Sequence, residues 1–179
     1  MTDASRKVSY GLAAVFVLLA LCVMIRPAGL AANDGLSYFG GFATTIIPYS
    51  LAFFLNAFFY WEAARGLNND HFPYKYAATS LRVMAVLLIG LVVTPHELVN
   101  YIHTKIGATL FSFQLLLSIW MLIKIAPSWQ NIILVLVEVL SGLAALYYLP
   151  KAHGLLLQSQ VIFQLAFGLL LVRVLNKNS

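Results

Sequence analysis

The hydrophobic positions of this chain fall into six long continuous runs, not into alternating patterns. A helix needs about 20 apolar residues to cross the hydrocarbon core of a bilayer, and each run is close to that length. The alternation typical of membrane β-barrels is absent from the sequence. We therefore predict an all-α, polytopic membrane protein whose residues 1–179 form a single domain of six transmembrane helices. The expected spans are 9–25, 42–61, 77–94, 106–125, 131–149 and 155–172.

The prolines support these boundaries. Five of the six prolines lie at or beyond the end of a run, where the missing N–H does no harm. The exception is Pro48, which we expect to kink the second span toward its outer end. Thr44 or Thr45 would then satisfy the carbonyl that the kink leaves free.

The charge distribution predicts the orientation. Hydrophobic residues make up 61% of the chain and charged residues only 9%, which excludes a soluble domain. The side of the termini would carry eight basic residues and the other side three, so both termini are expected in the cytoplasm. The first group is Arg6, Lys7, Arg65, Lys75, Arg82, Lys124, Arg173 and Lys177, and the second is Arg26, Lys105 and Lys151.

This orientation also accounts for the net charge of +5, which suits anionic lipid headgroups and not nucleic acid. We expect a multi-pass protein of the cell membrane, which is the inner membrane if the source is bacterial. The expected partners are membrane lipids, a small-molecule ligand, and either a partner membrane subunit or a second copy of the chain. No nucleic-acid partner is expected.

One carboxylate interrupts the fifth run. Glu138 lies inside the otherwise uncharged residues 132–149, and an acid within the membrane marks a functional site by default because it is costly to bury. Gln114 and Gln164 fall at the same depth when counted at about 1.5 Å per residue. The three side chains predict one of two arrangements. They line a polar cavity that binds a ligand or a proton, or they link the helices structurally, with Glu138 protonated or hydrogen-bonded to the glutamines.

The densest polar stretch of the chain, 94–105, lies at the outer end of the third and fourth spans. If it is helical, His96, Asn100 and His103 share one face, with Glu97 beside it. The loop opposite has a turn signal at 33–35 followed by two aromatic residues, and it is suited to cover a pocket. The candidate ligand-binding residues are Asp34, His96, Glu97, Asn100, His103, Gln114, Glu138 and Gln164.

Catalytic signatures are weak. The HExxH zinc pattern fails because Asn100 stands where the second histidine is needed. His96 and His103 could still bind zinc with Asp34, Glu97 or His153, but no metal or other cofactor is assigned. No serine lies in a G-x-S-x-G elbow, and a Ser/His/Asp set would have to come from separate loops. Catalytic residues are therefore not assigned, and enzymatic activity is left open.

Three short motifs carry a family resemblance: Asn33-Asp-Gly-Leu-Ser-Tyr-Phe-Gly40, Thr94-Pro95, and His103-Thr-Lys-Ile-Gly-Ala108. Together they resemble the six-helix superfamily of autophagy-modulator (DRAM and Frag/Sfk type) proteins and their uncharacterised prokaryotic relatives. The likeness covers the first two-thirds of the chain and leaves out Glu138. The family has a Ser-Asp pair before its loop glycine, whereas here Asp34 precedes Gly35 and the serine follows. The resemblance implies a role in lipid handling or membrane signalling, with no established reaction.

Three functions remain. The favoured one is binding of a lipid or small amphipathic molecule in an outward-facing polar pocket, formed by the outer candidates and floored by Glu138, Gln114 and Gln164. The second is a transporter component, because the substrate-binding components of vitamin uptake transporters are similar in size and helix count. The third is a metal-dependent intramembrane lipid hydrolase that uses His96 and His103.

Overall fold

A computed structural model describes residues 1–67, 74–94, 96–149 and 155–176, with the backbone alone for 96–100. Within these ranges every regular element is helical, as the sequence predicted, and no strand is present. Six α-helices and two short 3₁₀ helices occur in the order α1 (Asp3–Ile25), η1 (Pro27–Ala31), η2 (Gly35–Gly41), α2 (Ile46–Gly66), α3 (Tyr74–Val93), α4 (His96–Lys124), α5 (Trp129–Tyr148) and α6 (Leu156–Asn176).

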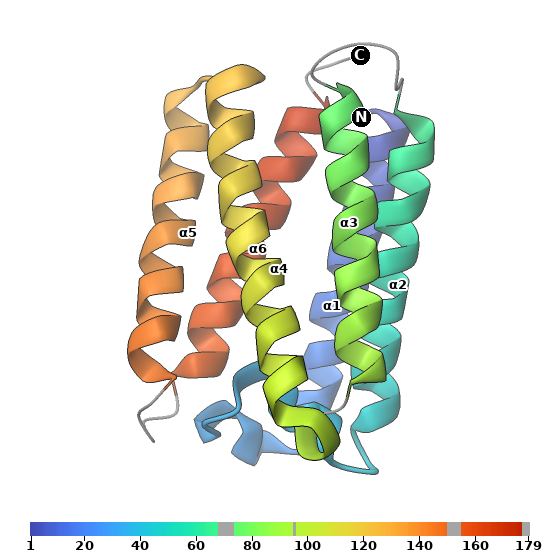
Figure 1. The fold of residues 1–179 in the computed structure, drawn as a ribbon, viewed down its shortest axis with the longest axis vertical. Coiled ribbons are helices and arrows are strands. Elements are labelled where there is room, and N and C mark those ends of the chain that lie inside the picture. The colour runs from blue at the N-terminus through green and yellow to red at the C-terminus, as the bar shows by residue number, and fades with distance from the viewer. Residues whose placement is uncertain (68–73, 95, 150–154, 177–179) are drawn as a thin grey trace.

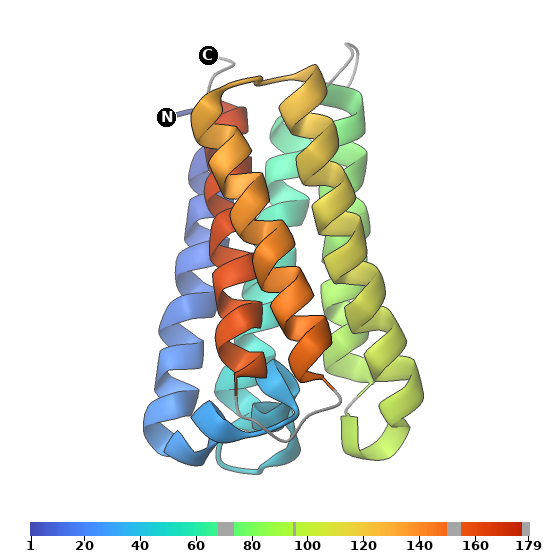
Figure 2. The same ribbon diagram turned by 90° about the vertical axis from the view of Figure 1, so that its left-hand side faces the viewer.

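The α-helices form an up-and-down bundle in which consecutive helices run in opposite directions (Figures 1 and 2). Each helix packs on its neighbour in the chain, and α6 also packs on α1 and α4. The start of α1 meets the end of α6, where the Thr2 hydroxyl donates to the Leu175 carbonyl at 3.0 Å. Helices η1 and η2 lie at the opposite end of the bundle, and we call them the cap (Figure 1).

Three helix starts differ from the predicted spans by four residues or more. Helix α1 begins at Asp3, six residues before the predicted start at 9. Helix α4 begins at His96, ten residues before the predicted span at 106, so the polar stretch that follows Pro95 is helical. Helix α2 begins at Ile46 instead of residue 42. Pro48 is then in the first turn, where its missing N–H has no helical partner and a kink is not required. The Thr45 hydroxyl donates to the Phe39 carbonyl at 2.7 Å instead of repairing a kink.

Among the described residues, five helices are long and apolar enough to cross a membrane: α1, α3, α4 from Tyr101 onward, α5 and α6. Helix α2 has the length but not the hydropathy, because Asn56 and Glu62 are among its residues. The five candidate spans are consistent with a multi-pass integral membrane protein.

The exterior of the bundle is apolar, and some polar side chains are buried within a mainly apolar core. Leu136, Leu140 and Leu143 follow one face of α5 and are more than half exposed, at 53%, 65% and 58%. Polar side chains of α4 and α5, including Gln114, Ser118 and Glu138, are completely buried. An apolar exterior around buried polar groups suits a lipid environment, where helices hold together through close packing and interhelical hydrogen bonds.

Candidate functional site

The cap is held in place by two side chains of α6. Gly35 has φ +56°, a left-handed conformation that glycine adopts at no steric cost, and it allows the chain to turn into η2. The next N–H, that of Leu36, donates to Gln160 Oε1 on α6 at 2.8 Å. Gln158 of α6 donates to the Leu30 carbonyl of η1 at 2.8 Å. The first turn of α6 therefore fixes both cap helices.

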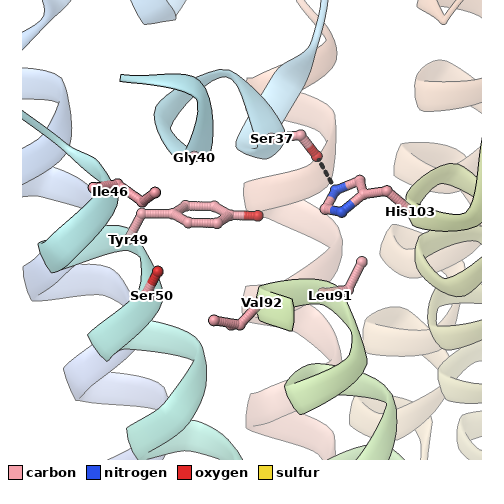
Figure 3. Close-up of a pocket in the computed structure, with 8 residues that line it drawn as sticks. All are labelled: Ser37, Gly40, Ile46, Tyr49, Ser50, Leu91, Val92 and His103. Carbon is pink, nitrogen blue, oxygen red and sulfur yellow. Dashed lines mark hydrogen bonds between the residues drawn. The ribbon is translucent and has the colours of Figure 1, made fainter. Parts of the chain in front are cut away.

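His103 connects the cap to the helices beneath it. Its ring is buried, and Nδ1 lies 2.6 Å from the carbonyl oxygen of Thr94 at the end of α3. A carbonyl has no hydrogen to donate, so Nδ1 carries the proton and donates it. In the neutral ring Nε2 is then an acceptor, and the Ser37 hydroxyl donates to it at 2.8 Å (Figure 3). The two contacts set both the tautomer and the orientation of the imidazole.

A cavity of about 60 Å³ lies beside this pair, enclosed by the cap, α2, α3 and α4. The Tyr49 ring crosses it from α2, with the hydroxyl directed toward Ser37 and His103 (Figure 3). A drug-sized ligand usually requires about 300–1,000 Å³, so this cavity suits one polar group or a few water molecules. Its lining residues are Ser37, Gly40, Ile46, Tyr49, Ser50, Leu91, Val92 and His103.

Of the predicted outer residues whose side chains are described, His103 lines the cavity. Asp34 is exposed, and its side chain does not cap η2. His96, Glu97 and Asn100 belong to α4, but their side chains lie outside the described part of the structure. Whether they share a site with His103 stays a prediction.

The deeper glutamines satisfy each other. Gln114 Nε2 donates to Gln164 Oε1 at 3.2 Å, and Gln164 Nε2 donates to Gln114 Oε1 at 2.9 Å. This reciprocal pair joins α4 to α6. Because each amide has a donor and an acceptor in the other, neither requires a ligand to be satisfied.

Glu138 pairs with Ser118 of α4 and not with Gln114. Its Oε1 accepts from the Ser118 hydroxyl at 2.9 Å, and its Oε2 is buried without a hydrogen-bond partner among the described residues. The predicted cluster of three polar side chains is thus two separate pairs in the described structure. The cavity beneath the cap is lined by neither pair.

The described residues hold no group of three His, Cys, Asp or Glu side chains that could bind a metal ion. His96, Glu97 and His153, which the metal hypothesis used, lie outside the described side chains. For His103 to bind zinc through either ring nitrogen, it would have to give up its contact with Ser37 or with Thr94.

The sequence interpretation missed Ser37, Tyr49 and Thr94 as site residues. One signal was available for Thr94: a proline follows it, so its carbonyl lies at a helix end without a helical donor. Ser37 lies 66 residues from His103, and no local pattern indicates that contact. The chain matches no protein-family model, no curated protein and no solved structure. The resemblance to the autophagy-modulator superfamily therefore stays a prediction.

Proposed function

We propose that this membrane protein binds the polar end of a lipid or small amphipathic molecule beneath its cap, at the outer surface of the membrane. The observation that supports this most is the composition of the cavity wall. His103, Ser37 and Tyr49 form a hydrogen-bonding side, and Ile46, Leu91 and Val92 form an apolar side. An amphipathic ligand presents the same two kinds of surface.

The cavity volume limits which part of a ligand enters it. About 60 Å³ accommodates an ester, carboxyl or hydroxyl group but no acyl chain. The chain would instead lie outside the bundle, where Ile47 and Val93 are 73% and 64% exposed beside the lining residues of α2 and α3. A binding mode of this kind leaves most of the apolar ligand in the bilayer.

The other predicted residues have two roles in this proposal. Asp34, His96, Glu97 and Asn100 remain the residues that we propose for contact with the headgroup. The buried pairs, Gln114 with Gln164 and Ser118 with Glu138, hold α4 against α6 and α5.

Filling the cavity should block binding. The probe is a monoacylglycerol with a photoactivatable diazirine next to its ester, and cross-linked peptides are identified by mass spectrometry. Val92→Phe places an aromatic ring in the cavity and should lower cross-linking to the peptide that contains Tyr49 about tenfold, the factor that corresponds to ~1.4 kcal/mol of binding free energy. Val86→Phe is the matched control, since this residue of the same helix is exposed and is not among the lining residues of the cavity. Equal cross-linking in both variants would contradict the proposed site.

The proposed topology has six spans with both termini in the cytoplasm. It is supported by the position of α2 within the bundle, where it lies alongside α1 and α3 over 21 residues (Figure 1). At about 1.5 Å per residue this length crosses the hydrocarbon core. The excess of basic residues on the side of the termini also supports it.

Cysteine labelling tests this topology. In a Cys22→Ala background, Asn33→Cys and Pro127→Cys each place one thiol at an exposed position. With six spans, a membrane-impermeant maleimide added to sealed cells should label position 33, and position 127 only after permeabilisation. If α2 does not cross, the two positions lie on the same side of the membrane. Labelling of both in sealed cells would therefore exclude the sixth span.

A further inference from the structure

We propose that Ser37 and His103 are a nucleophile and its general base, and that they transfer the acyl group of an ester-bearing amphiphile. This inference rests on the proposed function in one respect, because the ester must occupy the same cavity. It adds a covalent reaction that binding alone does not require.

The geometry is that of an activated hydroxyl. Ser37 Oγ and His103 Nε2 are 2.8 Å apart, within the range of about 2.6–3.2 Å expected for a nucleophile and its base. The opposite nitrogen, Nδ1, donates to the Thr94 carbonyl at 2.6 Å. A third group that accepts from Nδ1 holds the ring so that Nε2 faces the nucleophile, the role that a carboxylate has in a catalytic triad.

The ring that would act as base has little freedom to turn. His103 is only 4% exposed. Thr94 comes directly after α3, and its carbonyl is available because the sequence continues with proline. Ser37 is on η2, which is tied to α6 through Leu36. The base and the nucleophile are thus positioned by separate elements that each have their own anchor.

Tyr49 completes the arrangement. Its buried ring lies across the cavity, and its hydroxyl is directed toward Ser37 and His103 (Figure 3). A hydroxyl at this place can donate to the oxygen of the ester carbonyl as negative charge develops there. The cavity therefore holds a nucleophile, a base and a donor for the oxyanion around a space the size of an ester group.

The reaction needs only the ester and water. Ser37 Oγ attacks the carbonyl carbon while its proton passes to His103 Nε2. The bond from that carbon to the alcohol oxygen then breaks, and the leaving alcohol takes the proton from Nε2. Water attacks the resulting acyl-serine and gives one proton to Nε2. The bond between carbon and Ser37 Oγ breaks, Oγ recovers the proton, and a carboxylic acid is released.

The test is covalent labelling of the full-length protein in detergent micelles with a long-chain alkyl fluorophosphonate, which phosphonylates activated serines. We expect one adduct, located on Ser37 by peptide mass spectrometry and absent from Ser37→Ala. His103→Gln should slow labelling by at least about 10², the lower end of typical general-base contributions. Ser112→Ala should label like the unmodified protein, because Ser112 is exposed on α4 and is not among the lining residues of the cavity.

Size-exclusion profiles establish that each variant is folded, and the diazirine monoacylglycerol reports binding separately. A folded protein that cross-links this probe but gives no Ser37 adduct would overturn the acyl-transfer proposal and leave the binding site intact. Labelling of Ser37→Ala at the original rate, or of folded His103→Gln at that rate, would overturn it as well. Loss of cross-linking in Val92→Phe, together with a Ser37 adduct in the unmodified protein, supports both proposals.

Discussion

Gly35→Ala should destabilise the protein by about 2–3 kcal/mol, far more than its single added methyl group suggests. At φ +56° a side chain is strained whatever space surrounds it. The new Cβ would also lie 2.3 Å from Gln160 Oε1, which now accepts from the Leu36 N–H. Gln160 must move, and the cap loses its hydrogen bond to α6. Unfolding in mixed micelles with increasing sodium dodecyl sulphate measures the change.

Gly107→Ala is the matched control for this substitution. Gly107 is helical, and its added Cβ would meet only a Leu91 methyl group at 3.7 Å, which is an ordinary contact. Replacing a helical glycine by alanine should then stabilise the fold by roughly 0.5–1 kcal/mol. If the two variants unfold at the same detergent fraction, the left-handed turn at Gly35 does not hold the cap.

The double variant Ser118→Ala/Glu138→Leu should be at least as stable as the unmodified protein, and more stable by up to about 3 kcal/mol. Glu138 is completely buried, and its Oε2 lacks a hydrogen-bond partner among the described residues. Leucine removes that unsatisfied oxygen, and alanine removes the hydroxyl that would lose its acceptor. Ser118→Ala alone should instead cost about 1–3 kcal/mol, because it leaves Oε1 buried without its donor. The same detergent titration distinguishes these outcomes.

Glu138→Gln serves as the control for shape and charge. It keeps an acceptor for Ser118 and the size of the side chain, so it should fold as the unmodified protein does. A double variant less stable than Ser118→Ala alone would mean that Glu138 stabilises the bundle. A stable double variant that no longer binds the diazirine monoacylglycerol would instead assign the acid a part in function.

The continuous apolar runs were enough to predict that the helices exist. They were less useful for predicting where each helix begins and ends. Helix α4 starts ten residues early because a helix can continue past the membrane surface, where polar residues can be hydrated. Helix α2 starts late because residues 42–45 turn out of the cap before the helix begins. Hydropathy indicates where a chain is apolar enough for lipid, and it does not mark where hydrogen bonding starts.

Depth along the bundle was also predictable, but direction around each helix was not. Gln114 and Gln164 were placed at one level, and they do pair. Glu138 was expected beside them, yet it contacts Ser118, one turn along α4 from Gln114. The contact between Ser37 and His103 was harder to predict, because it forms only when the loop that contains Ser37 folds against α4. Sequence spacing contains no information on such a contact.

The attachment of the cap to α6 has a consequence for synthesis. The described residues that line the cavity all belong to the first 103 positions of the chain, whereas the glutamines that hold the cap are at 158 and 160. A nascent chain would therefore contain these lining residues well before it contains the two glutamines. The site matures only when the last helix has entered the membrane, so a protein truncated before α6 should retain these lining residues without a closed chamber.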